Sequence, residues 1–193
     1  MKTIYLFRHA EPLRLADIHQ EEWPLSPKGH DMAEALKTLN GAARMYASPL
    51  LRAVQTAQHT GLPLTVDPRL QERKTGNATP DMGDCWLRQY EDGTFKCPDG
   101  ESFDEVGQRM QACLEEILAA LGDGQAAIVV SHAAAICAYL KRFCTIRVTD
   151  RPSKTRAILW QERTVYAGNL PPMAGFALRF RQGTLVGIEA LSS

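Results

Sequence analysis

The chain has 193 residues, enough for one sizeable hydrophobic core and too few for two comfortable domains. Its 22 Lys and Arg residues balance 22 Asp and Glu residues, so the formal net charge is zero. That balance argues against a general binder of nucleic acid or of anionic membranes, which would carry an excess of positive charge. The five cysteines are widely spaced and include no C-x-x-C pair, and the sequence has no apolar run near 18 residues. We therefore expect one cytoplasmic domain over residues 1–193, with free thiols and no membrane span.

The first apolar run, residues 3–7, is short, β-branched and aromatic, which predicts a buried strand. Arg8 and His9 follow it directly. In open α/β sheets the carboxyl ends of strands border the ligand-binding crevice, so this pair would place a cation and a nucleophile there. An ordinary polar strand end is the plainer interpretation of the same two residues.

Two Ser-Pro pairs, at residues 26–27 and 48–49, each predict a helix start, with serine as N-cap and proline in the first turn. Apolar residues at helical spacing extend the first helix to Leu39 and the second to Gly61. Arg52 then lies in the first turn of the second helix, where backbone N–H groups and the helix dipole favour an anion. Short strands are predicted at residues 44–47 and 64–66.

Residues 73–100 are the least regular part of the chain and contain several glycines, prolines and aromatic residues. A connection of this length inside a compact domain is more often a binding loop or lid than a linker. We expect a lid-like insertion here, with Trp86 and Tyr90 facing the substrate and a short helix at 84–91.

Ser102 and Glu105 form a capping-box pattern ahead of a long amphipathic helix that ends near Leu121. The unbroken apolar run at 126–130 predicts a central strand covered on both faces, and His132 follows it. Beyond it we predict a helix at 133–143 and strands at 157–160, 164–166, 176–180 and 185–188. The alternation of strands and helices predicts a three-layer α/β/α sandwich with a largely parallel central sheet.

Two predicted strand ends thus carry histidine, His9 and His132, and a strand-to-helix junction carries Arg52. Together with Arg8 they would form a compact cationic site that contains no metal. Guanidinium groups match the geometry of phosphate oxygens, and a neutral imidazole is a competent nucleophile. Taken separately, Arg52 could be a solvated helix residue and His132 a core histidine.

Six segments in order resemble the motifs of the histidine phosphatase superfamily, also called phosphoglycerate mutase-like. They are residues 6–11, 24–29, 47–57, 70–72, 99–102 and 129–132. Several ordered matches are far more specific than any single one. The resemblance covers nearly the whole chain and implies the α/β fold expected above.

The resemblance implies that His9 attacks phosphorus and becomes phosphohistidine. It implies that Glu72 protonates the departing alcohol and then deprotonates the attacking water. Arg8, Arg52 and His132 would hold the phosphoryl oxygens, so fixed cations stand where many phosphoryl-transfer enzymes use Mg²⁺, and no cofactor is expected. Beside bound phosphate we expect His132 protonated, while His9 presents an unprotonated nitrogen. The alternatives for the acid are Glu11, Asp99 and Glu101.

Three positions depart from the family pattern. Ala10 and Ala133 stand where glycine is usual, and Pro12 stands where a Ser or Thr commonly contacts phosphate. Both alanines are small, so the backbone can still approach phosphate closely if φ is negative there. The departures put one or two secondary phosphate contacts in question.

The function expected from these features is a metal-independent phosphomonoesterase acting through phosphohistidine on a small phosphorylated metabolite. The chain length favours the compact phosphatase branch of the family, and the long cover segment favours a small substrate over a protein. The alternatives are a phosphoglycerate mutase-type phosphotransferase, a protein phosphohistidine or phosphoserine phosphatase, and a non-catalytic phospho-ligand sensor. We expect no nucleic-acid or membrane partner, and the sequence carries no signal for the oligomeric state.

Overall fold

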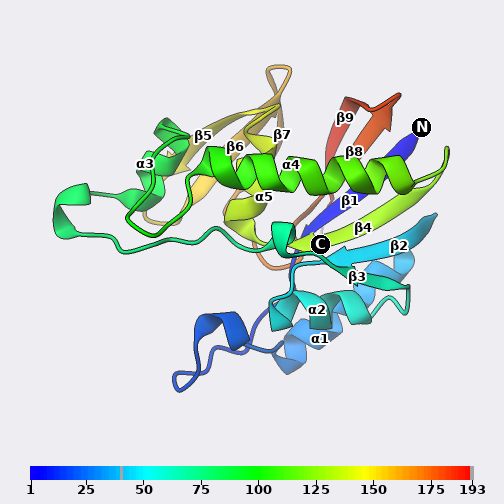
Figure 1. Cartoon of the computed structure of the whole chain (residues 1–193), viewed down its shortest axis with the longest axis horizontal. Coiled ribbons are helices and arrows are strands. Elements are labelled where there is room, and N and C mark those ends of the chain that lie inside the picture. The colour runs from blue at the N-terminus through cyan, green and yellow to red at the C-terminus, as the bar shows by residue number, and fades with distance from the viewer. Residues whose placement is uncertain (40, 192–193) are drawn as a thin grey trace.

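A computed structural model describes residues 1–39 and 41–191 of the chain. At its centre is a six-stranded sheet with the order β3-β2-β4-β1-β8-β9 (Figure 1). These strands are β1 (Lys2–Arg8), β2 (Ala42–Ala47), β3 (Leu64–Val66), β4 (Ala126–Ser131), β8 (Gly175–Arg181) and β9 (Thr184–Leu191). The first four run parallel, whereas β8 and β9 are antiparallel to their neighbours. The predicted α/β fold with a mostly parallel central sheet is confirmed.

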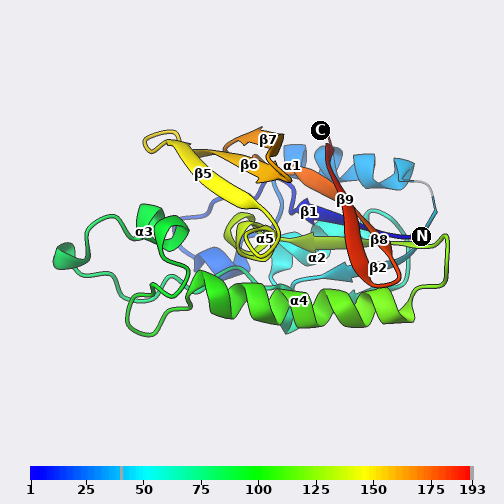
Figure 2. The same cartoon turned by 90° about the horizontal axis from the view of Figure 1, so that it is seen from above.

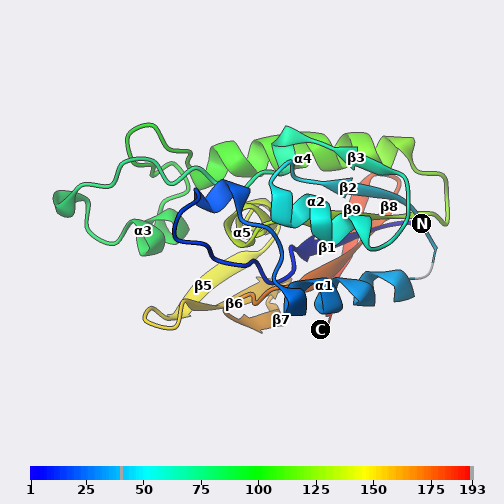
Figure 3. The ribbon, with the colours of Figure 1, turned by 90° about the horizontal axis from the view of Figure 1, so that it is seen from below.

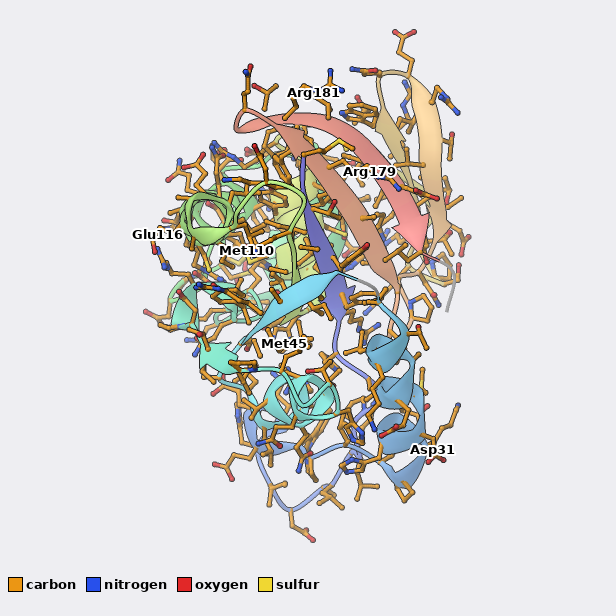
Figure 4. All side chains as sticks on the ribbon, turned by 90° about the vertical axis from the view of Figure 1, so that its right-hand side faces the viewer. Asp31, Met45, Met110, Glu116, Arg179 and Arg181 are labelled. Atoms are coloured by element: carbon orange, nitrogen blue, oxygen red, sulfur yellow. The ribbon has the colours of Figure 1, made fainter. Side chains whose placement is uncertain are left out.

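Helices cover both faces of this sheet (Figure 1). Helices α1 (Pro27–Ala33) and α2 (Leu51–Gln58) pack on one face, and α4 (Phe103–Ala120) and α5 (Ala133–Leu140) pack on the other. The strand β4 is buried throughout, and its alternate residues enter two separate core clusters. Figure 4 shows Met45 on the side of α2 and Met110 under α4, on opposite faces of the sheet.

The start of α4 forms as the sequence predicts. The Ser102 hydroxyl accepts from the Glu105 N–H at 3.2 Å, and the Glu105 carboxylate accepts from the Ser102 N–H at 2.8 Å. This capping box satisfies two backbone donors that have no partner within the helix. One stripe of α4 is buried in the core, whereas Glu116 points outward (Figure 4).

The other helix ends differ from the prediction in three places. Ser26 caps α1 as predicted, but α1 passes at Glu34 into the 3₁₀ helix η2 (Glu34–Thr38). The predicted N-cap at Ser48 is wrong: α2 begins at Leu51, and the Ser48 hydroxyl binds both the Leu50 N–H and His132. Helix α5 is shorter than predicted and ends at Leu140.

A second, antiparallel sheet lies beside α5, as Figure 2 shows from above. Its strands, in the order β5-β6-β7, are β5 (Thr145–Asp150), β6 (Thr155–Trp160) and β7 (Arg163–Gly168). Strand β5 was not predicted from the sequence, nor was the separation of these strands from the central sheet. One edge of this sheet contacts α3, so it supports the segment that extends away from the central sheet.

That segment, residues 73–100, reaches outward beyond α5 (Figures 1 and 2). It contains the 3₁₀ helix η4 (Pro80–Met82) and the helix α3 (Cys85–Glu91), which confirms the short helix predicted at 84–91. Two further 3₁₀ turns, η1 (Gln20–Glu22) and η3 (Pro68–Leu70), flank the ends of the parallel strands. Within the described residues, no helix has both the length and the apolarity needed to cross a membrane.

Candidate active site

The two histidines lie side by side because the strands that precede them are neighbours. Strands β1 and β4 pair in parallel with Arg8 opposite Ser131, so His9 and His132 leave the sheet at the same level. The His9 N–H donates to the Ser131 carbonyl at 2.9 Å, and the two ring centroids are 5.1 Å apart. The parallel register therefore places both imidazoles at the carboxyl edge of the sheet, where α/β proteins bind ligands.

Arg52 connects the two imidazoles. It lies in the first turn of α2 and is 8% exposed. Its Nε donates to His9 Nε2 at 3.1 Å, its Nη2 lies 3.4 Å from His132 Nδ1, and its Nη1 donates to the Gln20 carbonyl at 2.7 Å. In Figure 3 the loop that carries η1, and with it Gln20, lies beside the start of α2. The guanidinium is thus fixed between both rings rather than solvated.

These contacts determine which nitrogen of each ring carries the proton. A guanidinium can only donate, so His9 Nε2 must be unprotonated. A carbonyl can only accept, so His9 Nδ1 donates to the Ala10 oxygen at 2.7 Å. By the same reasoning His132 Nδ1 accepts from Arg52, and His132 Nε2 donates to the Ser48 hydroxyl at 2.8 Å. His9 therefore carries its lone pair on Nε2, where it accepts from Arg52.

Electrostatics keep both rings neutral in this state. Burial, together with the positive charge of Arg52, lowers the pKa of His9 to about 3. Burial also lowers the pKa of His132 far below its usual range, and His9 and Arg52 add to that effect. The expected protonation of His132 concerns the phosphate-bound state and stays a prediction, since only a nearby anion would offset these causes.

Arg8 supplies the second guanidinium. Its Nη1 is hydrogen-bonded to the carbonyl of Leu170, which lies between β7 and β8. Burial lowers the pKa values of Arg8 and Arg52, and the nearby Glu72 carboxylate offsets part of that lowering in each case. The carboxylate therefore stabilises the charged form of the two arginines from across the site.

Glu72 is held at the start of α5. Its carboxylate accepts from the backbone N–H groups of Ala135 at 3.0 Å and of Ala134 at 3.3 Å, and from its neighbour Arg73 at 2.8 Å. Glu72 lines the same cavity as His9, Arg8 and Arg52. A carboxyl group is thus fixed within the cationic site, next to the helix that follows His132.

The alternative acids are placed less favourably. The Glu101 carboxylate is paired with Arg109 at 2.8 Å, and Glu11 is paired outside the cavity with Lys28 at 3.1 Å. Asp99 lines the cavity, where it accepts a hydrogen bond from Asn77 at 3.0 Å. Geometry favours Glu72 because it alone among these carboxylates spans from the cavity to the backbone that follows His132.

Three residues hold the site in place although the sequence analysis gave them no role in it. The Arg109 side chain, on α4, donates to the backbone carbonyls of Arg69 and Gln71 at 2.7 and 2.9 Å, and so fixes the chain after η3 that carries Glu72. The Thr56 hydroxyl accepts from the Ala10 N–H and donates to the Arg52 carbonyl, and Ser48 binds His132. Thr56 and Ser48 lie within the recognisable 47–57 segment, whereas Arg109 resembles any polar residue of a long amphipathic helix.

The site opens into a cavity of about 760 Å³ with three walls above the reaction centre. One wall comes from the loop around Pro12 and η1, one from residues 71–77, and one from α3. Trp86 belongs to the third wall, as predicted. The prediction that Tyr90 faces the substrate is wrong. Tyr90 is 6% exposed, and its hydroxyl accepts from Arg156 at 3.0 Å in the core.

The cavity concentrates positive charge in a chain whose net charge is zero. Three carboxylates, Glu21, Glu72 and Asp99, line it. The six lining cations are Arg8, Arg14, Arg52, Arg73, Lys74 and Lys154. Across residues 1–39 and 41–191, no group of three or more His, Cys, Asp or Glu side chains is arranged to hold a metal ion. An oxyanion entering this cavity therefore meets guanidinium and ammonium groups.

The three departures from the expected family pattern fit without strain. Ala10 and Ala133 both have φ outside the left-handed region, so alanine needs no unusual backbone there. Ala10 is fully buried, and its N–H is already bonded to Thr56. Pro12 lines the cavity and has no N–H or hydroxyl to offer a ligand.

Comparison with known proteins places this geometry in a family. A family model described as histidine phosphatase superfamily (branch 1) matches residues 4–155. Among curated relatives, a probable phosphoglycerate mutase GpmB of Enterobacter sp. (strain 638) is 34% identical over 156 residues, which are 70% of this chain and 72% of that protein. A protein of the same name from Yersinia pestis (strain Pestoides F) is 33% identical over the same shares of both chains.

Solved structures show the same fold at lower identity. A mycobacterial glucosyl-3-phosphoglycerate phosphatase, 21% identical, superposes with a TM-score of 0.70 over 98% of this chain and 97% of that one. A phosphoglycerate mutase from Thermus thermophilus, 24% identical, gives 0.62 over 98% and 99%. At this level of sequence identity the similarity concerns the fold alone. Proteins named as phosphatases and proteins named as mutases both have this fold.

Proposed function

Because the chain belongs to the histidine phosphatase superfamily (branch 1), we propose that it is a phosphomonoesterase that works through a phosphohistidine at His9. The superfamily supports an enzyme of the phosphoryl-transfer type. The observation that carries the finer proposal is the unprotonated His9 Nε2, which accepts from Arg52 in a buried cationic site and can attack once Arg52 turns to the phosphate. A neutral imidazole in that position is a nucleophile that needs no proton removed before it attacks.

In the first step His9 Nε2 attacks phosphorus in line with the ester oxygen. The N–P bond forms as the P–O bond breaks, and the Glu72 carboxylic acid gives its proton to the departing alcohol. Arg8 and Arg52 bind the phosphoryl oxygens and offset their charge. His132 is fully buried behind Arg52, and it would donate to a phosphoryl oxygen only after its Nδ1 gains the proton expected in the phosphate-bound state. Stabilising charge in a site with little water contributes more than the same contacts in solvent.

In the second step water attacks the phosphorus of phosphohistidine. Glu72, now a carboxylate, takes a proton from the water as the P–O bond forms, and the P–N bond breaks. The lone pair returns to His9 Nε2, and inorganic phosphate leaves. One carboxyl group thus serves as acid in the first step and as base in the second.

The cavity supports a small phosphorylated metabolite as the substrate class. Its volume of about 760 Å³ is within the range of small-molecule sites, and its excess of cations suits an anionic ester. Residues 73–100 act in this proposal as a lid-like insertion of a single domain, with Trp86 on α3 facing the substrate. A protein phosphatase would instead need a shallow site open to a flat partner surface.

The decisive experiment assays a panel of phosphomonoesters with the wild-type protein and His9→Ala, with and without EDTA. Rapid acid-free quenching and mass spectrometry should trap phosphate on His9 in the wild type only. His59→Ala is the matched control, because His59 lies away from the cavity against His30 and Glu34. Ester hydrolysis that survives in His9→Ala, or that stops in EDTA, would contradict the proposal.

A phosphotransferase is the second candidate, since the curated relatives carry the name probable phosphoglycerate mutase. The same first step serves both activities, and they differ in whether water or a second alcohol accepts the phosphoryl group. Incubation with 3-phosphoglycerate and NMR detection of the 2-isomer separates them. Isomer formation faster than phosphate release would favour the mutase, and tight phosphate binding without turnover would favour a sensor.

A further inference from the structure

Two thiols in the 73–100 segment lie close enough to react with each other. The Sγ atoms of Cys85 and Cys97 are 3.3 Å apart, and all five cysteines of the chain are free. Neither residue takes part in the phosphoryl chemistry proposed above. We propose that Cys85 and Cys97 are a modification site that hydrogen peroxide or a similar peroxide converts reversibly to a disulfide.

The proximity is produced by the fold of this segment. After α3 the chain turns at Asp92, where the Phe95 N–H donates to the Asp92 carbonyl at 3.2 Å, and then runs back along the helix. The Arg88 guanidinium stacks on the Phe95 ring at 4.0 Å and holds this return. A disulfide requires the sulfurs to approach to about 2.05 Å, a further closure of roughly 1.2 Å that side-chain rotation can supply.

The remaining cysteines are poor competitors for an oxidant. Cys113, Cys137 and Cys144 are buried in the core, and burial raises the pKa of Cys113 to about 12 and of Cys144 to about 11. The thiolate is the reactive form, so the raised pKa values protect Cys113 and Cys144, and complete burial keeps an oxidant from Cys137. Cys85 is half-buried and reachable, whereas Cys97 is 2% exposed and lies against it.

The chemistry closes in two steps. The Cys85 thiolate attacks one peroxide oxygen, the O–O bond breaks, and sulfenic acid and hydroxide form. The Cys97 sulfur then attacks Cys85 Sγ, the S–O bond breaks, and water leaves with the proton of the thiol. In sum, two thiols and one hydrogen peroxide give one disulfide and two waters, and an external dithiol reverses the change.

The new bond would join two walls of the cavity. Cys85 is the residue before Trp86, which lines the α3 wall. Cys97 precedes the Pro98 carbonyl, which accepts from the N–H of Asn77 at 2.8 Å in the opposite wall. Oxidation therefore links α3 to the chain at Cys97 and Pro98, which is hydrogen-bonded to Asn77. The mobility of the lid-like segment then depends on the redox state of the two cysteines.

The test treats the full chain with a small excess of hydrogen peroxide and maps its peptides by mass spectrometry without reduction. We expect one cross-linked pair, Cys85–Cys97, about 2 Da lighter than the reduced pair, while the other three thiols still react with an alkylating reagent once the oxidised chain is unfolded. Dithiothreitol should restore both thiols. Amide exchange across residues 86–98 should slow at least severalfold on oxidation.

Two variants make the outcome specific. In Cys97→Ser the oxidised Cys85 has no partner and should pass to sulfinic acid, whereas Cys85→Ser should leave Cys97 unmodified at the same peroxide dose. Because Cys97 is buried, its serine variant is first checked for an unchanged circular dichroism spectrum. Cross-links that involve Cys113, Cys137 or Cys144, dimers through Cys85, or sulfinic acid at Cys85 in the wild type would each overturn the proposal.

Discussion

The reaction centre and the segment over residues 73–100 are built by different means. His9, Arg52 and His132 are 4%, 8% and 0% exposed, and each follows directly from a strand or begins a helix of the central layers. The 73–100 segment has one seven-residue α-helix and one three-residue 3₁₀ helix and is otherwise irregular. Chemistry that any member of the fold needs is placed on rigid elements, whereas the surface that meets a particular substrate is placed on loops.

The forces that hold the two regions differ accordingly. A parallel ladder of β1 with β4 sets the spacing of His9 and His132, and slipping it would expose an entire buried strand face. The outer segment depends on partly exposed ion pairs, such as Lys96 with Glu105 and Arg151 with Asp84. Exposed pairs of this kind contribute about 0–1 kcal/mol each, so the segment can shift while the reaction centre stays in place.

The largest expected effect comes from removing the guanidinium that joins the two imidazoles. Arg52→Gln should lower kcat/KM for phosphomonoesters by roughly 10²–10³-fold, because a preorganised donor to the developing charge is lost. Arg44→Gln, on the exposed part of β2, is the matched control and should be silent. If Arg52→Gln loses less than tenfold with its fold intact, the assignment of the centre to this edge of the sheet is wrong.

The next effect separates the proposed acid from its competitor. Glu72→Gln keeps one oxygen, which can still accept from the Ala135 N–H, but it loses the acceptor for the Ala134 N–H and cannot transfer a proton. For alkyl phosphate esters kcat should fall about 100-fold, whereas p-nitrophenyl phosphate, whose leaving group needs no proton, should lose far less. The check is to measure kcat for both esters in Glu72→Gln and in Glu101→Gln. A leaving-group-dependent loss in Glu101→Gln and none in Glu72→Gln would assign the acid to Glu101.

The third effect is on stability and follows from the burial of neutral His9. Its pKa is about 3 in the folded chain and about 6.5 unfolded, so the unfolded state binds more protons between those values. The contribution of His9 to stability is therefore complete above about pH 6.5 and is lost progressively as the pH falls towards 3. Denaturant unfolding of wild type and His9→Asn at pH 7 and pH 4.5 should show a smaller loss in the variant, by roughly 1–2 kcal/mol. Equal losses in the two proteins would mean that His9 takes up a proton without unfolding.

The smallest expected effects distinguish two aromatic residues of α3, Trp86 in the cavity wall and Tyr90 in the core. Trp86→Ala should raise KM about 3–10-fold with kcat nearly unchanged, because it removes one cavity wall group. Tyr90→Phe should leave KM alone and cost about 1 kcal/mol of stability, because it removes the hydroxyl that accepts from Arg156. Steady-state kinetics beside urea unfolding of both variants checks this. A raised KM in Tyr90→Phe would mean that the substrate contacts Tyr90, which the structure places in the core.

The residues that could be predicted from the sequence are those whose local signal agrees with their tertiary setting. The capping box at Ser102 and the fully apolar β4 each have one physical solution, and the structure adopts it. The histidines and arginines of the centre follow from strand ends, and the parallel order of the strands brings them together.

Two of the failures, at Ser48 and Tyr90, have the same cause: a side chain that binds a partner distant in the sequence. Ser48 has the pattern of an N-cap, but its hydroxyl binds His132 across the sheet, and the helix starts later. Tyr90 has the pattern of a lid aromatic, but it packs edge-on against Phe103 and turns inward. Long-range pairing of this kind is invisible to local propensity. Strand β5 was missed although Ile146 and Val148 alternate with polar residues, because that alternation is short and half-exposed.

The place of β1 in the sheet has a consequence for the making of the protein. Within this sheet β1 leaves the ribosome before its partners, yet in the folded sheet it lies between β4 and β8, and the Arg8 side chain binds the carbonyl of Leu170. Contacts so distant along the chain form late and slow folding. A nascent chain therefore carries His9 without its neighbours until β4 and β8 have also been synthesised.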